Sequence, residues 1–141
     1  MTEIVYDEEL APQEYNKLRR QVGWDELTAL QAERGLAHTT FVSVARENGK
    51  AVGMGRALFD YGYTVYFGDV IIDPAYQGRG IGKEIINRLT DRVTGAASKG
   101  DRLMFVLGAA KGKEAFYEKL GFQIRPSEIF GAGMSKWIEV K

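Results

Sequence analysis

The stretch QGRGIGK at residues 77–83 has the residue types and spacing of a loop that binds phosphate. It lies between an apolar run and a helical pattern, so it would expose the free N–H groups at the start of a helix. Its three glycines allow a tight turn and a close approach of the backbone to oxygen atoms, and Arg79 and Lys83 add positive charge. These features predict a site for a phosphorylated ligand. The alternative is a glycine-rich turn that only joins a strand to a helix.

Two familiar nucleotide-binding motifs do not fit this loop. A dinucleotide motif G-x-G-x-x-G that began at Gly78 would need glycine at position 83, which is Lys83. A Walker loop would need glycine at position 77 and serine or threonine at position 84, which are Gln77 and Glu84. The sequence therefore predicts a phosphorylated ligand of another kind.

The composition excludes several other classes of site. The chain has no cysteine, which excludes disulfides, thiolate metal sites and a cysteine nucleophile. His38 is the single histidine and has no second histidine with which to share a metal, so we expect no metal site. Lys plus Arg and Asp plus Glu both number 19, and this balance does not favour a nucleic-acid partner.

The length of 141 residues predicts a single domain over residues 1–141. No apolar stretch approaches the roughly 20 residues needed to cross a bilayer, so we expect no membrane span. The first ten residues, MTEIVYDEEL, are acidic where a signal peptide would be basic and then apolar. We therefore expect a cytoplasmic protein.

The periodicity of the sequence predicts an α/β fold. Helices are expected from Pro12 to Gly23 and from Asp25 to Gly35, and an Asn-Gly turn pair predicts a hairpin within residues 39–60. The later elements are a strand at 63–73, a helix after the glycine loop, a strand at 102–108, a short helix at 113–121, and closing strands near 122–126 and 133–140. This order predicts one mixed central sheet of six to seven strands with helices on both faces.

Three segments together resemble the GNAT superfamily of N-acetyltransferases. Gln77, Gly80 and Gly82 match its Q/R-x-x-G-x-G/A motif, and VIIDPAY at 70–76 is similar to the central strand that precedes this motif. AFYEKLGF at 115–122 resembles the second landmark of the family, a helix with a tyrosine followed by a strand. The resemblance implies a single GNAT-like domain that binds acetyl-CoA and transfers its acetyl group to an amine.

The resemblance also implies where acetyl-CoA would bind. The backbone N–H groups of the loop would hold its pyrophosphate, and the central strand would pair with its pantetheine arm. Alternate residues of a strand face one side, which selects two strand residues for these contacts. The predicted cofactor-binding residues are Val70, Ile72, Gln77, Gly78, Arg79, Gly80, Ile81, Gly82 and Lys83.

Two groups are predicted to take part in the transfer itself. Tyr117 matches the family tyrosine that protonates the departing thiolate, whereas its place on an amphipathic helix would otherwise indicate core packing. The Val70 N–H would stabilise the oxyanion, again by resemblance. Because a cysteine acyl-enzyme is excluded, we expect direct attack of the amine within a ternary complex.

The general base has no clear candidate. In a regular strand, Gly68 and Tyr66 would face the same side as Val70, and neither is a carboxylate. Asp69 would face the opposite side unless a bulge at Gly68 turned it, and Asp73 is expected to cap the turn before Pro74. Water relayed by Tyr66 or by main-chain carbonyl groups is the default.

The acceptor is predicted to be a primary amine of a small molecule. The segment FDYGYTVY at 59–66 is rich in aromatic residues, which would suit an amine with a hydrophobic or aromatic body. The alternatives are a protein or peptide amine, and a GNAT-fold module that binds an acyl-CoA without turnover. The resemblance also leaves a homodimer open.

Overall fold

The structure is a computed structural model that describes residues 2–141, and it divides into two compact units. The first unit ends at Leu107, and the second runs from Gly108 to Lys141. The elements of the first unit are β1 (Ile4–Asp7), α1 (Pro12–Gln21), α2 (Ala29–Ala37), β2 (Phe41–Glu47), β3 (Lys50–Phe59), β4 (Thr64–Ile72), the short 3-10 helix η1 (Pro74–Tyr76), α3 (Ile81–Ala96) and β5 (Met104–Leu107). The second unit contains α4 (Glu114–Glu118).

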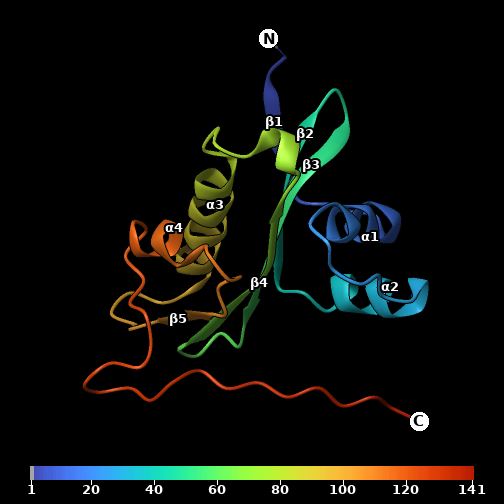
Figure 1. Cartoon of the computed structure of the whole chain (residues 1–141). Coiled ribbons are helices and arrows are strands. Elements are labelled where there is room, and N and C mark those ends of the chain that lie inside the picture. Colours follow the sequence, from blue (N-terminus) through green and yellow to red (C-terminus); the bar gives the residue numbers. More distant parts are fainter. Residues whose placement is uncertain (1) are drawn as a thin grey trace. The chain divides into compact units, whose positions relative to one another are not determined.

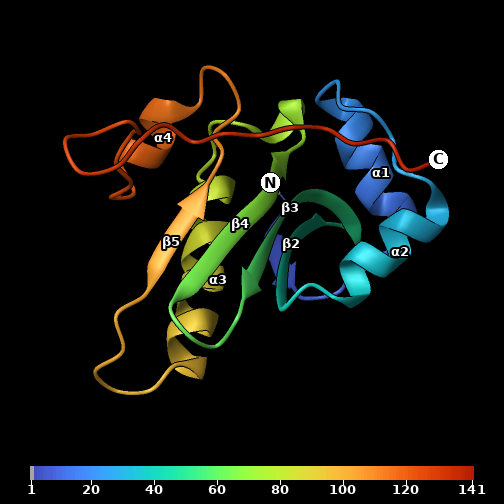
Figure 2. The same cartoon turned by 90° about the horizontal axis from the view of Figure 1, so that it is seen from below.

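The first unit is built on a mixed five-stranded sheet in the order β1-β2-β3-β4-β5. The strands from β1 to β4 are antiparallel to their neighbours, whereas β5 runs parallel to β4, and Figure 2 shows these two side by side. The hairpin of β2 and β3 closes at Asn48 and Gly49, which both have positive φ. The predicted hairpin and the predicted parallel β4–α3–β5 crossover are both confirmed.

Helices cover both faces of the sheet, as predicted. α3 lies on one face, and α1 and α2 lie on the other (Figure 1). The apolar stripe of α3 is buried, since its residues recur at helical spacing and turn toward the sheet; they are Ile81, Ile85, Ile86, Leu89 and Val93. The core on the opposite face contains Tyr15, Leu18, Ala32, Val44, Ala51, Met54 and Ile71. The two apolar layers hold α1 and α3 in fixed positions on the sheet.

Residues 2–141 form five strands instead of the six to seven that were predicted, and the closing strands are the error. Residues 122–126 and 133–140 form no strand, and Met134, Trp137 and Val140 are more than 90% exposed. Alternating apolar residues predict a strand only where a neighbouring strand can bond to them. The short β1 was not predicted, because four residues carry too little pattern.

The second helix starts later than predicted. Thr28, rather than Asp25, caps α2, because its hydroxyl accepts a hydrogen bond from the Gln31 N–H at 3.1 Å. Gly35 lies inside this helix instead of ending it. Among the described residues, no helix is both long and apolar enough to cross a membrane.

Candidate active site

The glycine loop joins η1 to α3 through two left-handed turns. Gly78 has φ of 80°, and Gly80 has φ of 81° and is the N-cap of α3. Only glycine adopts this conformation without strain, which explains both residues. Before the loop, Asp73 caps η1 as predicted, since its carboxylate accepts a hydrogen bond from the Ala75 N–H at 2.9 Å.

The loop presents a row of unused main-chain donors. In the described part of the chain, none of the N–H groups of residues 78–83 donates a hydrogen bond. The first intrahelical bond of α3 is donated by Glu84 to the Gly80 carbonyl at 3.1 Å. These free N–H groups point from the positive end of a helix dipole, and Lys83 and Arg79 lie beside them. The residues present therefore fit a diphosphate group.

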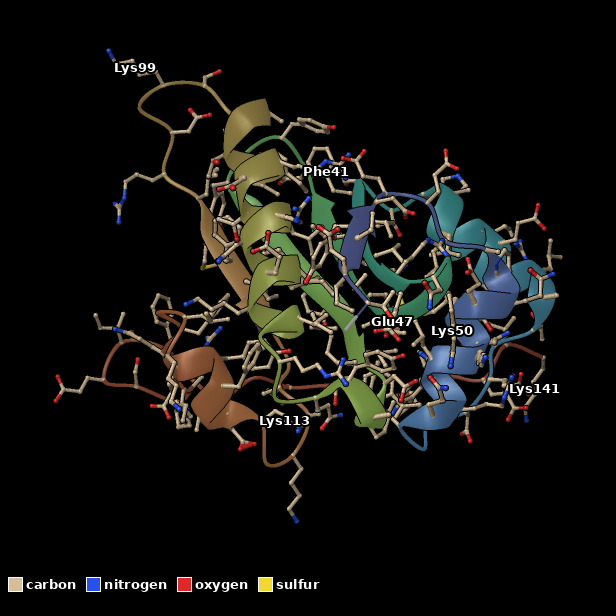
Figure 3. The ribbon with its side chains drawn as sticks, turned by 90° about the horizontal axis from the view of Figure 1, so that it is seen from above. Phe41, Glu47, Lys50, Lys99, Lys113 and Lys141 are labelled. Carbon is tan, nitrogen blue, oxygen red and sulfur yellow. The ribbon has the colours of Figure 1, made fainter. Side chains whose placement is uncertain are left out.

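Side chains fix the loop in place. The Gln77 amide donates to the Ile72 carbonyl at 3.1 Å, which ties the loop back to the end of β4. The Tyr76 hydroxyl donates to Glu47 at 2.6 Å, and Glu47 lies beside Lys50 at the β2–β3 turn (Figure 3). The Arg79 guanidinium stacks over the Tyr76 ring at 4.8 Å. Gln77 and Arg79 therefore support the loop, whatever they contribute to a ligand.

β4 extends beyond its parallel partner. The pairing with β5 runs from Thr64 to Phe67, whereas β4 continues to Ile72. On the β5 side, the strand edge at residues 68–72 is therefore unpaired among the described residues. Val70 and Ile72 lie in this part of β4, which an extended ligand could join by main-chain hydrogen bonds.

A β-bulge interrupts β4 at the point where its edge becomes free. Arg56 pairs with Gly68 and Met54 pairs with Ile71, so two residues of β4 oppose one residue of β3. The bulge falls on Asp69, which has φ of 51°. The sequence indicated a bulge at Gly68, and the structure has it one residue later.

The bulge changes which residues share a face. A Cβ added at Gly68 would lie 3.3 Å from the Tyr66 ring, so these two positions face the same side. Asp69 also turns to the face covered by α1, where Tyr15 contacts it. Val70 lies on the α3 face, because its Cγ2 would be 3.7 Å from a Cβ at Gly55. The expectation that Gly68 and Tyr66 share a side with Val70 is therefore wrong.

Asp69 is enclosed by donors. The Tyr15 hydroxyl donates to Oδ2, and Arg19 Nη1 lies 3.5 Å from Oδ1. Arg56 Nε lies 3.1 Å from Oδ2 as an ion pair, although its N–H does not point at the oxygen as in a hydrogen bond. Burial and the bond to Asp69 raise the pKa of Tyr15 to about 12, so the phenol remains a donor at neutral pH.

Tyr117 lies on α4 in the second unit, where aromatic side chains surround it. Its ring packs edge-on against Phe116 and Phe122, at centroid distances of 4.9 Å and 5.9 Å. Burial raises the pKa of the Tyr117 hydroxyl, because the phenolate would lose its hydration. A phenol that stays protonated can serve as a general acid.

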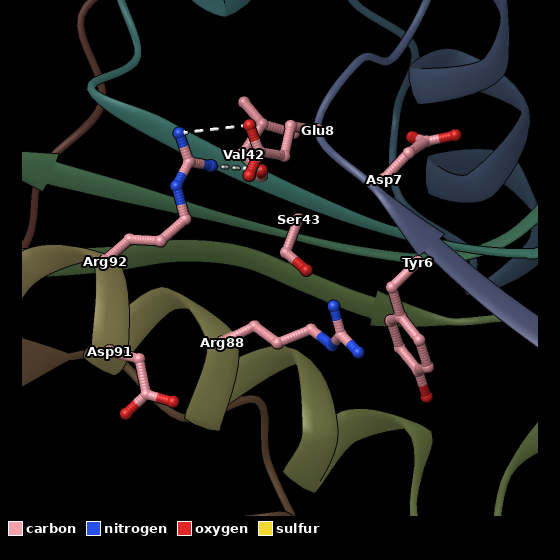
Figure 4. Close-up of a pocket in the computed structure, with 8 residues that line it drawn as sticks. All are labelled: Tyr6, Asp7, Glu8, Val42, Ser43, Arg88, Asp91 and Arg92. Atoms are coloured by element: carbon pink, nitrogen blue, oxygen red, sulfur yellow. Dashed lines mark hydrogen bonds and ion pairs between the residues drawn. The ribbon is translucent and has the colours of Figure 1, made fainter.

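A pocket of about 230 Å³ lies on the α3 face, between α3 and the strands β1 and β2 (Figure 4). Its arginines already have partners within the protein. Arg92 lies 3.4 Å from Glu8 and donates to the Val42 carbonyl at 3.1 Å, and Arg88 bonds Glu84 at 2.9 Å. Because these charges are satisfied internally, the pocket is a weak candidate for catalysis. No group of potential metal ligands occurs among residues 2–141.

The family follows from comparison with known sequences. The family model described as "Acetyltransferase (GNAT) domain" matches residues 38–124. The chain belongs to the GNAT family of acetyltransferases. The matched region contains the glycine loop, the bulge and Tyr117, but it leaves out both α1 and α2.

Several proteins of known sequence or structure are similar to this GNAT-family chain. The uncharacterized N-acetyltransferase ycf52 of Pyropia yezoensis is 30% identical over 122 residues, 84% of this chain and 68% of that protein. Histone acetyltransferase TAP1 of Glycine max is 35% identical over 89 residues, 63% of this chain and 37% of that protein. The chain thus spans little more than a third of the length of the soybean protein. The crystal structure of SA2161 from Staphylococcus aureus, named a probable acetyltransferase, is similar in fold, with a TM-score of 0.82 and 25% sequence identity. The superposition covers 98% of this chain and 100% of the SA2161 chain.

The partners of Asp69 are what sequence reasoning missed in this GNAT domain. Tyr15 and Arg19 precede Asp69 by 54 and 50 residues, and Arg56 comes from the neighbouring strand. The helical spacing of Tyr15 and Arg19 could have indicated that both side chains leave α1 on one face. Nothing in the sequence indicated that this face meets the bulge.

Proposed function

We propose that the protein transfers an acetyl group from acetyl-CoA to a primary amine of a small molecule, by direct attack in a ternary complex. One observation carries the donor part of the proposal: the N–H groups of residues 78–83 are unused at the positive end of α3. They suit the diphosphate of coenzyme A. The unpaired edge of β4 beside them suits its amide-containing arm.

The proposed roles of the residues follow the charges that develop during transfer. Acetyl-CoA supplies the acetyl group as a thioester, and coenzyme A leaves as the free thiol. The Val70 N–H donates to the carbonyl oxygen as negative charge grows there. Tyr117 gives its proton to the sulfur as the carbon–sulfur bond breaks, while the amine loses a proton to water. We assign water as the proton acceptor because the oxygens of Asp69 are already engaged.

The sheet face that α1 and α2 cover supports an acceptor with a hydrophobic body. Leu58, Tyr66 and Val106 are paired across β3, β4 and β5, and Leu58 and Tyr66 are 40% and 44% exposed. Asp60, which lies nearby in the chain, uses Oδ1 to accept bonds from the Gly62 and Thr64 N–H groups. The exposed apolar side chains of this row would suit an amine with a hydrophobic body. The nearby Asp60 carboxylate already accepts main-chain hydrogen bonds, which disfavours a strongly basic peptide.

A protein or peptide amine is the second candidate. One relative that covers 63% of the chain is named a histone acetyltransferase. A peptide acceptor would need acidic side chains to hold its other basic residues, whereas a small amine with a hydrophobic body would not. Turnover rates with the two kinds of amine therefore separate the candidates.

The test is an assay of free CoA release over a panel of amines, together with calorimetry of acetyl-CoA binding. We expect binding of acetyl-CoA and the fastest turnover with arylalkyl or alkyl amines. Faster turnover with lysine-containing peptides would select the second candidate. Binding without turnover on any amine would favour an acyl-CoA-binding module, and absence of binding would contradict the proposal.

A further inference from the structure

Asp69 joins three elements that are distant in the sequence. Tyr15 and Arg19 reach it from α1, Arg56 reaches it from β3, and Asp69 itself forms the bulge of β4. The side chains of Arg19, Arg56 and Asp69 are only 13%, 17% and 18% exposed. We call these four residues the Asp69 cluster. It fastens the α1 face of the first unit to the bulge.

The two arginines of the cluster extend it to both ends of the α2 region. Arg19 Nε donates to the Asp25 carbonyl at 2.7 Å, before α2 begins. Arg56 Nη1 donates to the Gly35 carbonyl at 3.3 Å and to the Thr39 hydroxyl at 2.8 Å, near the end of α2. A single carboxylate therefore connects the bulge with the whole α1–α2 segment.

The charges of the cluster require Asp69. Two guanidinium groups lie against one carboxylate, and both stack over the Tyr15 ring at 5.7–5.8 Å. If the carboxylate lost its charge, two mostly buried cations would face each other without an anion between them, which is strongly unfavourable. The cluster would then have to open, and the bulge would lose its side-chain support.

The backbone of the bulge also requires this support. Asp69 has φ of 51°, a left-handed conformation that a non-glycine residue keeps only where its surroundings enforce it. The next residue is Val70, which lies in the part of β4 that extends beyond the pairing with β5. The conformation at Asp69 therefore sets the direction of the N–H that the proposed function assigns to the oxyanion.

We propose that Asp69 is a positioning residue, which acts through Tyr15, Arg19 and Arg56 to fix the bulge and to orient the Val70 N–H toward the acyl group. This inference rests on the proposed function. It differs from a general-base role, which would need a carboxylate oxygen free to face the amine. Both oxygens of Asp69 instead face donors of the protein.

The test compares Asp69→Asn, Tyr15→Phe and the double variant in steady-state kinetics across pH. We expect each single variant to lower kcat by about tenfold, with the double variant little worse, because both changes open one cluster. The shape of the pH–rate profile should remain that of the wild type. Asp91→Asn and Tyr6→Phe are matched controls on the opposite face, and we expect them to leave kcat unchanged.

A general base would give a different pattern. Asp69→Asn would then lower kcat by about 10²- to 10⁴-fold and remove the acidic limb of the profile, whereas Tyr15→Phe would have little effect. That result would overturn the positioning role. The positioning role would also be overturned if the losses of kcat in the two single variants multiplied in the double variant.

A second readout does not depend on activity. Amide hydrogen exchange at Ile71, which pairs with Met54 beside the bulge, should be faster in Asp69→Asn than in the wild type, and unchanged in Asp91→Asn. Acetyl-CoA affinity should stay within about twofold, because the glycine loop is intact. If the wild type binds no acetyl-CoA, the proposed function fails, and the exchange rates still decide whether Asp69 fixes the bulge. Equal exchange in the two variants would refute it.

Discussion

Gly55 on β3 lies directly beneath Ile85 on α3, so close that a Cβ added at Gly55 would be 2.6 Å from Ile85 Cγ2. The same Cβ would be 3.1 Å from a Leu89 methyl group. Glycine at this position lets α3 approach the sheet, and α3 carries the loop donors at its first turn. The contact between Gly55 and Ile85 therefore sets the height of the glycine loop above the sheet.

Gly55→Ala is expected to lower the free energy of unfolding by about 1–3 kcal/mol, because an overpacked core must shift. Gly95→Ala is the control within α3, since a Cβ at Gly95 meets nothing within 4 Å. That control should raise stability by up to about 1 kcal/mol, because alanine favours helix. Urea denaturation measures both changes, and equal stability of the two variants would contradict the close approach.

Gly80→Val is expected to weaken acetyl-CoA binding by at least about tenfold, because a β-branched residue resists φ of 81° and would turn the loop N–H groups away. Gly100→Val is the matched control, since Gly100 has φ of 93° and lies beyond the opposite end of α3 from the loop. Calorimetry should show wild-type affinity in the control. Equal affinities in both variants would remove the loop from the binding site.

Tyr117→Phe is expected to lower kcat by about 10²- to 10⁴-fold, the usual contribution of a general acid. Acetyl-CoA affinity should remain nearly that of the wild type. Because burial raises the pKa of Tyr117, the wild-type rate should show no loss of this acid until the pH exceeds the ordinary phenol value of about 10. Phe122→Leu removes a ring next to Tyr117 without touching its hydroxyl and serves as the control for packing. An unchanged kcat in Tyr117→Phe would exclude the acid role.

The sequence predicted the elements that have a strong local pattern. The isoleucines of α3 recur at helical spacing, which predicted the helix. The glycines of the loop indicated a tight turn, and its place before a helix indicated free N–H groups. The two closing strands were predicted from short local segments, and such segments cannot supply the hydrogen-bonded neighbour that a strand needs. β1 was missed because four residues carry little periodic signal.

The Asp69 cluster was beyond sequence reasoning for a different reason. The sequence placed Asp69 on one face of β4 and named a bulge as the condition that would turn it. Whether the bulge forms depends on the pairing of β4 with β3, and the partners of Asp69 depend on how α1 crosses the sheet. Both are tertiary features, and a shift by one residue exchanges the faces of a strand.

Acid should weaken the contact that Glu14 makes with Arg46. Arg46 Nη1 donates to Glu14 at 2.6 Å, and this bond holds the pKa of Glu14 below its usual value. A carboxyl group with a lowered folded pKa adds stability above its unfolded pKa, and this stability is lost as the pH falls through the folded value. Glu14→Gln should therefore flatten the acid side of the stability profile by less than about 1 kcal/mol, since the pair is partly exposed. Glu33→Gln, an exposed change on α2, should leave the profile unaltered.

Alkali should weaken the Asp69 cluster through Tyr15. Its pKa is raised to about 12, mainly by burial and then by the bond to Asp69. A phenol with a raised folded pKa adds stability that is complete below its unfolded pKa of about 10 and is lost as the pH rises through the folded value. The midpoint of thermal unfolding of the wild type should therefore fall between pH 10 and pH 12. In Tyr15→Phe the midpoint should fall less over the same range. Tyr63→Phe changes a tyrosine that is 60% exposed and should fall as the wild type does. If Tyr15→Phe lost stability with alkali as steeply as the wild type, the phenol would not be a buried donor to Asp69.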